Sequence, residues 1–209
     1  MAAVEIDPAC VRALGLTLRR YRNIQVVEGN ILELPVAKLI PAPYRVAGNI
    51  PYNLTGELIR KLLDQPPRPR RLSLVVQKEV AERWTATTGA SLATVAVQVF
   101  AVSRTVMTIP ASAFIPVPKV DSALVILDVR ENPAVQVDDL NRFFRFVEAV
   151  FQFRRKQLGG TLARLAGVSG AEAAQRLNEI GIDPARRPQT LTLPEWQAAY
   201  DAFNPRFGR

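Results

Sequence analysis

Short apolar runs alternate with longer amphipathic stretches along residues 1–130. The runs rich in β-branched residues, which predict strands, are 4–6, 24–28, 46–49, 72–77, 102–109 and 123–130. Between them, the stretches that predict helices are 7–20, 55–63 and 78–85. Residues 91–100 fit either a helix or a strand. This alternation predicts an α/β fold with a mostly parallel sheet and helices on both faces.

Helical periodicity dominates the rest of the chain. Apolar residues recur at i, i+3, i+4 and i+7 over 140–151, which indicates an amphipathic helix. Three shorter helical stretches follow, at 158–165, 171–180 and 194–203. Residues 130–133 have the character of a linker. We therefore predict two domains, residues 1–130 with the sheet and residues 134–209 as a small all-helical domain.

The composition excludes several classes of site. Hydrophobic residues make up 48% of the chain and charged residues 22%, which is typical of a soluble globular protein. Cys10 is the single cysteine and there is no histidine, so an internal disulfide, a zinc site and a hydrolase triad are not expected. The sequence shows no bilayer-spanning apolar run and no signal-peptide pattern. We expect a cytoplasmic protein without a metal.

The net charge of +8 predicts a polyanionic partner. The charge is uneven, with a net of +6 over residues 1–130 and +2 over residues 131–209. Arginine stacks on bases and forks onto phosphates better than lysine does. The clustered candidates for RNA contact are Arg68, Arg70, Arg71, Arg154, Arg155 and Lys156. The alternative is a basic surface that only aids solubility.

The tetrad Asn49-Ile50-Pro51-Tyr52 ends the predicted strand at 46–49. An exocyclic amino group on a purine is a poor nucleophile until acceptors draw its lone pair out of the ring. The Asn49 side-chain oxygen and the Ile50 carbonyl supply two acceptors, Pro51 stiffens the turn, and Tyr52 offers a ring for an extruded base. These four are the candidate catalytic residues. A strand that ends in a proline turn, with Tyr52 in the core, is the structural alternative.

With this tetrad, the chain resembles the ribosomal RNA adenine N6,N6-dimethyltransferases, the small-subunit dimethyladenosine transferase family. The segments that carry the resemblance are 3–7, 26–31, 49–52, 76–83, 114–123 and 151–158. The resemblance implies a Rossmann-like methyltransferase sheet followed by a small helical domain, and it favours a helix at 91–100. It also implies S-adenosylmethionine as the cofactor.

The resemblance assigns further residues by their positions in these segments. Glu5 corresponds to the family's ligand of the ribose hydroxyls. Asn30 stands where the family usually has an aspartate that contacts the cofactor's adenine, and an amide loses the charge assistance of a carboxylate. With Ile31 and Asn49, these residues form the expected cofactor site. Phe114 is the expected second stacking face beside Tyr52, and a core phenylalanine that anchors its loop is the alternative.

The implied function is the transfer of methyl groups to the N6 atoms of two adjacent adenosines of small-subunit ribosomal RNA. The implied partner is a small-subunit precursor, bound by a monomer during ribosome biogenesis. A large-subunit rRNA adenine methylase of the antibiotic-resistance type shares the tetrad and is one alternative. A non-catalytic ribosome-assembly or RNA-binding factor is the other.

The chain departs from the family pattern at its start. None of its 11 glycines forms a G-x-G turn near the N-terminus, where the family has its glycine loop. The resemblance implies that an arm, the first strand, this loop and a helix are missing, on the order of 50 residues. A misassigned start codon or a fragment is one explanation, and a truncated gene is the other.

This departure has expected consequences for activity and folding. Little methyl transfer is expected from residues 1–209 by themselves. The missing strand would leave the strands at 4–6 and 46–49 with unpaired edges, so the chain would fold poorly by itself. Alternatively, these two strands close up and pair directly.

Overall fold

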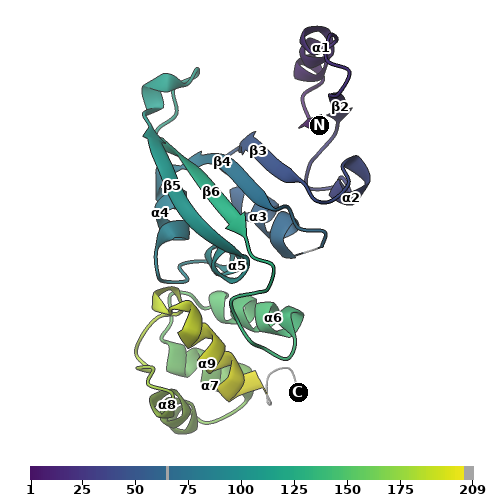
Figure 1. The fold of residues 1–209 in the computed structure, drawn as a ribbon. Coiled ribbons are helices and arrows are strands. Elements are labelled where there is room, and N and C mark those ends of the chain that lie inside the picture. The colour runs from purple at the N-terminus through teal and green to yellow at the C-terminus, as the bar shows by residue number, and fades with distance from the viewer. Residues whose placement is uncertain (65, 205–209) are drawn as a thin grey trace.

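A computed structural model describes residues 1–64 and 66–204. Its strands form two separate sheets (Figure 1). The small sheet pairs β1 (Ala2–Glu5) with β2 (Gln25–Glu28) in parallel. The large sheet has the order β3-β4-β6-β5, and its strands are β3 (Arg45–Asn49), β4 (Arg71–Gln77), β5 (Ala101–Ile109) and β6 (Ser122–Val129). β3 and β4 run parallel, while β6 is antiparallel to both β4 and β5.

The helices follow the predicted amphipathic stretches closely. Those among the strands are α1 (Pro8–Thr17), α2 (Val36–Leu39), α3 (Thr55–Asp64), α4 (Lys78–Thr85) and α5 (Leu92–Phe100). The C-terminal ones are α6 (Leu140–Phe151), α7 (Leu158–Ala166), α8 (Gly170–Glu179) and α9 (Leu193–Phe203). Residues 92–100, ambiguous by pattern, form a helix whose N-cap is Ser91. The sequence did not predict α2, nor the 3₁₀ turns η1 (Ala111–Ala113) and η2 (Pro188–Thr190), because such short elements carry no periodicity.

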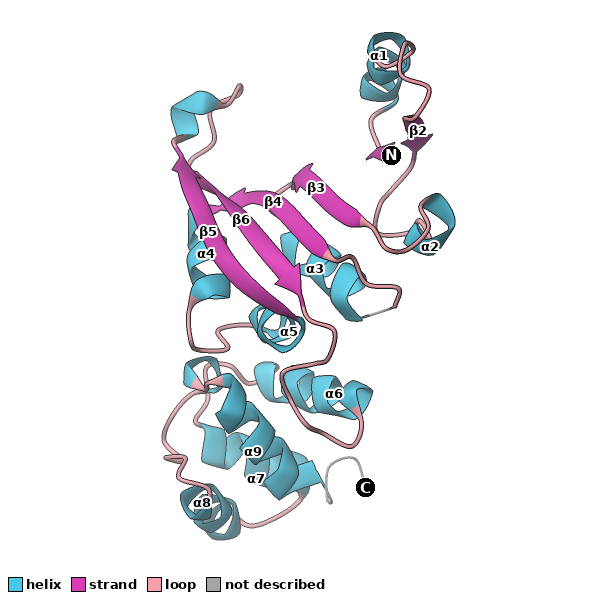
Figure 2. Cartoon of the chain, in the orientation of Figure 1, coloured by secondary structure: helices cyan, strands magenta, loops and turns pink. Residues whose placement is uncertain are grey.

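The core of the large sheet lies on one face. Leu72, Leu74 and Val76 of β4 are fully buried, and the residues between them are half-buried. Since side chains alternate along a strand, one face is covered and the other is partly open. Helices α3, α4 and α5 lie on the covered face (Figure 2). Helices were expected on both faces, but α1 packs beside β1 and β2 instead of against the large sheet.

The strands on either side of the break between the sheets do not pair with each other. In the described part of the chain, β1 pairs only with β2 and β3 pairs only with β4. The expected unpaired edges are therefore present, and the alternative of direct closure is wrong. The segment after β2 is anchored to the large sheet's helices, since Leu32 packs against the core and its carbonyl accepts from the Lys61 side chain of α3 at 2.6 Å.

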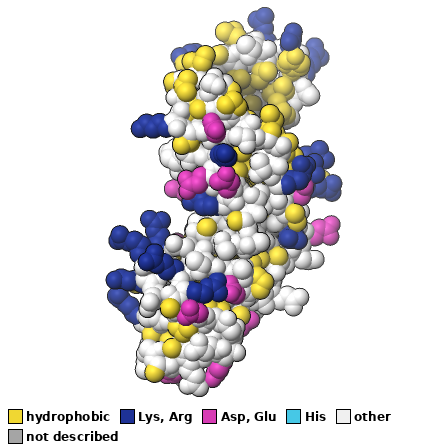
Figure 3. Space-filling view, turned by 90° about the vertical axis from the view of Figure 1, so that its left-hand side faces the viewer, with side chains coloured by type: hydrophobic (Ala, Val, Ile, Leu, Met, Phe, Trp, Pro, Cys, Tyr) yellow, Lys and Arg dark blue, Asp and Glu magenta, His cyan; other side chains and the backbone are white. Residues whose placement is uncertain are grey.

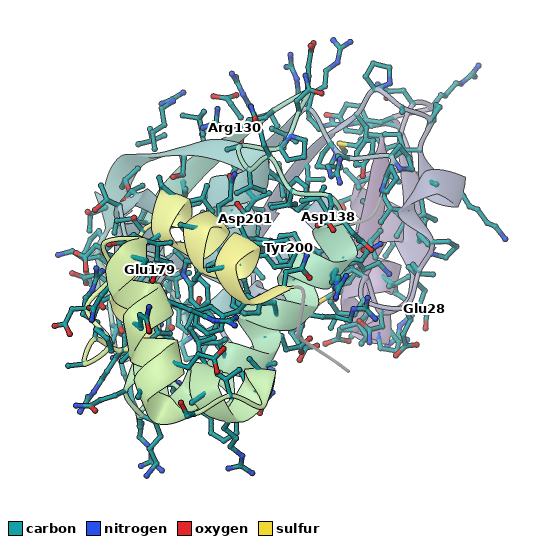
Figure 4. The ribbon with its side chains drawn as sticks, turned by 90° about the horizontal axis from the view of Figure 1, so that it is seen from below. Glu28, Arg130, Asp138, Glu179, Tyr200 and Asp201 are labelled. Atoms are coloured by element: carbon teal, nitrogen blue, oxygen red, sulfur yellow. The ribbon has the colours of Figure 1, made fainter. Side chains whose placement is uncertain are left out.

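The four C-terminal helices surround a cluster of aromatic rings. Phe146 makes edge contacts with Trp196 and Tyr200. The Tyr200 hydroxyl donates to Asp138 at 2.6 Å (Figure 4). Burial and this carboxylate raise the pKa of Tyr200, and the hydrogen bond from Tyr200 lowers the pKa of Asp138.

Residues 130–135 connect the sheet to these helices and are hydrogen-bonded to α5. The Arg130 N–H donates to the Phe100 carbonyl at 2.7 Å, and the Ala134 N–H donates to the Val99 carbonyl at 2.8 Å. Val135 is buried. Within residues 1–64 and 66–204, no helix combines the length and the apolar character needed to cross a membrane.

Candidate active site and RNA-binding surface

The predicted catalytic tetrad begins where the parallel pair β3–β4 ends. Asn49 is the last residue of β3, and the Ile50 N–H still donates to the Val75 carbonyl at 3.1 Å. Pro51 then turns the chain towards α3. Asn49 is exposed, and no other described residue donates a hydrogen bond to its side chain or to the Ile50 carbonyl. Neither predicted acceptor is therefore occupied by a hydrogen bond from another described residue.

Tyr52 is held by a residue to which the sequence assigned no role. Its hydroxyl lies 3.0 Å from the hydroxyl of Ser122, which is fully buried at the start of β6. The preceding Asp121 accepts from the Ala111 N–H through its carboxylate and from the Lys78 N–H through its carbonyl, both at 3.0 Å. The segment 114–123 is thus tied to the tetrad, although no local sequence pattern indicates this support.

Phe114 lies half-buried in the loop that follows η1. Its N–H donates to the Ala111 carbonyl at 3.1 Å. Among the described residues there is no ring contact between Phe114 and Tyr52. Its role as a second stacking face stays a prediction.

Three of the four predicted cofactor residues, Glu5, Asn30 and Ile31, lie at the carboxyl end of the small sheet, whereas Asn49 ends β3 of the large sheet. Glu5 ends β1, and one of its carboxylate oxygens accepts from the N–H groups of Ile6 and Asp7 at 2.7 and 2.9 Å. These bonds fix the side chain and leave the second oxygen for ribose hydroxyls. Acceptors at the ends of parallel strands are the chemistry that a ribose requires. Glu5 therefore fits the nucleoside part of S-adenosylmethionine.

Asn30 lies just after β2 but is engaged by its own loop. Its side-chain oxygen accepts from the Leu32 N–H at 3.0 Å, and its amide donates to Glu33 at 2.9 Å. The oxygen retains a second lone pair that can accept from an adenine amino group. Ile31 packs against the hydrophobic core. No described contact joins this edge of the small sheet to Asn49.

Arg68 and Arg70, just before β4, and Arg71, its first residue, lie at the end of the sheet away from the tetrad. Because β3 and β4 are parallel and Arg45 pairs with Arg71, residues 68–71 adjoin the start of β3. The guanidinium of Arg68 covers the Phe100 ring at 4.2 Å, and Arg71 pairs with Asp128 at 2.5 Å. Burial lowers the pKa of Arg68. Arg70 is the exposed member of this cluster.

The second basic cluster, Arg154-Arg155-Lys156, directly follows α6. All three residues are exposed, and no described carboxylate lies within 4 Å of their cationic groups. On the face seen in Figure 3, the Lys and Arg side chains form separate groups, one of them beside the helical part. Among the described residues, no group of three His, Cys, Asp or Glu residues could hold a metal ion.

The sequence model of the ribosomal RNA adenine dimethylase family matches residues 1–199. The chain belongs to this family. It is 35% identical to ribosomal RNA small subunit methyltransferase A of Dehalococcoides mccartyi over 93% of its own length and 68% of that protein. It is also 35% identical to the protein of the same name from Geobacillus kaustophilus, over 100% of its own length and 75% of the relative.

Two solved structures share the fold. A dimethyladenosine transferase from Plasmodium falciparum superposes with a TM-score of 0.75 over 98% of this chain and 82% of that one, at 22% identity. The 23S rRNA methyltransferase ErmE superposes with a TM-score of 0.71 over 97% of this chain and 81% of that one, at 26% identity. The predicted Rossmann-like α/β class is therefore confirmed.

Proposed function

We propose that the protein is an rRNA adenine N6,N6-dimethyltransferase that uses S-adenosylmethionine. The observation that carries this proposal is the pair of acceptors at Asn49 and Ile50, bonded to no other described residue and placed at the end of β3 beside a Tyr52 ring that Ser122 holds. Family membership supports the same chemistry, because the family is that of the ribosomal RNA adenine dimethylases.

The chain's own residues supply positioning and hydrogen-bond acceptors. The Asn49 side-chain oxygen and the Ile50 carbonyl accept from the two N–H groups of the target amine, which directs the nitrogen lone pair out of the ring plane. Tyr52 stacks against the extruded base. Glu5, with Asn30, holds the nucleoside part of the cofactor. When bound, S-adenosylmethionine supplies an electrophilic methyl group, so positioning is the main task of the protein.

We further propose a specific substrate, an oligomeric state and a cellular location. The substrate is a precursor of the small ribosomal subunit, with two adjacent adenosines as targets, and the protein acts as a monomer in the cytoplasm. The names of the curated relatives support the small subunit. The free, exposed Cys10 suits a reducing compartment.

The test is methyl transfer to small-subunit rRNA, read by mass spectrometry of N6,N6-dimethyladenosine. Asn49→Ala should lower the rate about 10²–10³-fold, since one preorganised polar group at a reacting centre is worth roughly 2.7–4 kcal/mol. Asn178→Ala is the matched control, because Asn178 is exposed on α8. Because residues 1–209 contain no G-x-G turn near their start, a form extended upstream by such a turn is assayed in parallel.

The outcomes separate the alternatives. Equal rates for Asn49→Ala and Asn178→Ala would exclude the acceptor mechanism. Methylation of large-subunit rRNA in place of small-subunit rRNA would favour the antibiotic-resistance type. Salt-sensitive RNA binding without methyl transfer in either form would favour a non-catalytic assembly factor.

A further inference from the structure

A single polar contact joins the part of the chain that carries the small sheet to the rest of the molecule. Residues 1–40, here called the small-sheet unit, contain Glu5 and Asn30, whereas the tetrad lies at the end of β3 in the large sheet. The Lys61 ammonium of α3 donates to the Leu32 carbonyl at 2.6 Å. Within the described residues, no other hydrogen bond or ion pair links the small-sheet unit to the residues that follow it.

The peptide groups of Leu32 connect this contact to Asn30. The Leu32 N–H donates to the Asn30 side-chain oxygen at 3.0 Å. The N–H groups of Glu33 and Leu34 donate to the Asn30 backbone carbonyl at 2.9 and 3.0 Å. Residues 30–34 are therefore a loop closed on itself, and a shift of the Leu32 carbonyl moves Asn30 with it.

The other end of α3 is fastened to the tetrad. Thr55 is buried at the start of the helix, and its hydroxyl lies 3.2 Å from the Tyr52 carbonyl and 3.4 Å from the Pro51 carbonyl. Lys61 follows six residues later, about 9 Å along the helix axis. The helix itself is fixed in the core by the buried residues Leu58, Ile59, Leu62 and Leu63. One rigid element thus contacts both the tetrad and the Asn30 loop.

Apolar contacts give the small-sheet unit little further orientation. Ile31, Leu32 and Val36 pack against the core, but no residue of β1, α1 or β2 is buried. Figure 1 shows these three elements standing apart from the large sheet. Apolar burial is non-directional, whereas a hydrogen bond restrains both a distance and an angle. The bond from Lys61 is therefore the directional restraint on this unit.

We propose that Lys61 is a positioning residue that sets the separation between the nucleoside site at Glu5 and Asn30 and the amine site at Asn49. Transfer between two bound reactants requires the reacting atoms to approach within about 3–3.5 Å. The two sites lie in parts of the molecule that pair in separate sheets, so an error in their separation acts directly on the reaction. This inference rests on the proposed function, since it takes both sites to be occupied during methyl transfer.

Three substitutions separate this role from a change in charge. Lys61→Met keeps a long apolar side chain and removes the donor, and Lys61→Arg restores a cationic donor. Lys38→Met is the matched control, because Lys38 is exposed on α2 and its side chain bonds to no described residue. It removes the same charge from the small-sheet unit. If Lys61→Met fails to fold in thermal unfolding, Lys61→Gln, which keeps a shorter polar side chain, takes its place.

The first measurement needs neither cofactor nor RNA. Cys10 is the single cysteine and is exposed on α1, and the two tryptophans, Trp84 and Trp196, are buried outside the small-sheet unit. Time-resolved energy transfer from these indoles to a dye on Cys10 reports the distribution of distances between the two parts. Lys61→Met should broaden this distribution. Lys61→Arg and Lys38→Met should match the unsubstituted protein.

The second measurement is steady-state kinetics in whichever form transfers methyl groups. Lys61→Met should lower kcat about 10- to 100-fold, since misplacement by 1 Å has an effect of that order. The KM values for S-adenosylmethionine and RNA should stay nearly unchanged, because Glu5 and Asn30 move together and the tetrad is untouched. Lys61→Arg should recover most of kcat.

Two results would overturn the assignment of Lys61. One is the same distance distribution for Lys61→Met and Lys38→Met, and the other is a raised KM with an unchanged kcat. If neither form of the unsubstituted protein transfers methyl groups, the proposed function fails. The energy-transfer comparison still decides in that case whether Lys61 holds the small-sheet unit in place.

Discussion

At the scale of single residues, the hydroxyl pair of Tyr52 and Ser122 joins the tetrad to β6 across 3.0 Å. Tyr52→Phe and Ser122→Ala each remove this hydrogen bond and keep the ring. Each should slow methyl transfer by about 1 kcal/mol, or roughly fivefold, because the ring loses its fixed orientation. The double variant should be no slower than either single one. Additive losses in this double-mutant cycle would show that the two hydroxyls act separately.

Glu195 of α9 accepts charged and backbone hydrogen bonds from two residues that precede the helix. It accepts from Arg186 at 2.5 Å and from the Thr192 N–H at 2.7 Å, and the Arg186 hydrogen bond is the main cause that lowers its pKa to about 2. Because the pKa is lower in the folded state, this stabilisation is full above about pH 5 and is lost as the pH falls towards 2. Glu195→Gln should therefore cost roughly 1.5–3 kcal/mol at pH 7 and clearly less at pH 3.

Urea unfolding of the unsubstituted protein and of Glu195→Gln, at several pH values from 3 to 7, measures the free energy that the substitution costs at each pH. Glu79→Gln is the control, since Glu79 is exposed and its contact with Arg83 is 4.0 Å long. It should change the free energy of unfolding little at any pH. A Glu195→Gln cost that stays constant from pH 7 to pH 3 would contradict the assigned pairing.

The sequence predicted the reacting residues better than their supports. Asn49, Ile50 and Tyr52 were identifiable because their chemistry follows from residue type and order. Ser122 lies 70 positions from Tyr52, and no local pattern indicates that the two hydroxyls meet. Arg68 was predicted to contact RNA, yet its guanidinium group stacks on the Phe100 ring. Long-range packing decides which arginines stay free, and a cluster of charges in the sequence carries no information on it.

At the scale of elements, the loop between α4 and α5 packs tightly against α9 at Gly89. The Gly89 N–H donates to the Leu191 carbonyl at 2.6 Å. A Cβ at this position would lie 2.7 Å from the buried Trp196 indole nitrogen and 2.8 Å from a Val95 methyl group. Gly89→Ala should therefore destabilise the protein by about 1–3 kcal/mol through overpacking.

Gly160→Ala in α7 is the control for Gly89→Ala, because the same substitution is expected to have the opposite effect on stability there. No atom outside its own helix lies within 4 Å of a Cβ built there. Gly160→Ala should stabilise the protein by up to about 1 kcal/mol, because alanine favours a helix. Denaturant unfolding measures both variants. A neutral Gly89→Ala would mean that the loop and α9 are not packed as closely as the structure has them.

Element boundaries were predictable where periodicity or a cap was strong. α4 matches its predicted bounds because Lys78–Thr85 has a clear apolar face between a strand and a loop. The division into two sheets was foreseeable only as a consequence of the family's strand order. Long-range contacts such as the hydrogen bond from Lys61 to the Leu32 carbonyl are not described by periodicity, so the sequence left open whether β1 and β3 would pair.

At the scale of the whole molecule, stability is distributed unevenly between the two sheets. No residue of β1, α1 or β2 is buried, whereas β4 carries three fully buried side chains. Segments with little buried apolar surface open locally. Amide hydrogen exchange should therefore be at least about 100-fold faster in residues 2–28 than in β4 and β6. Protection equal to that of β4 would show that the small sheet unfolds only with the large one.

The same measurement, repeated over a range of protein concentrations, tests the proposed monomer. Unpaired strand edges are templates for pairing with another chain, and β1 and β3 both present such edges in the described structure. For a monomer, the fast exchange of residues 2–28 should not depend on concentration. Slower exchange confined to β1 and β3 at high concentration would instead mean that copies of the chain pair through these edges, because an intermolecular ladder protects only the amides that enter it.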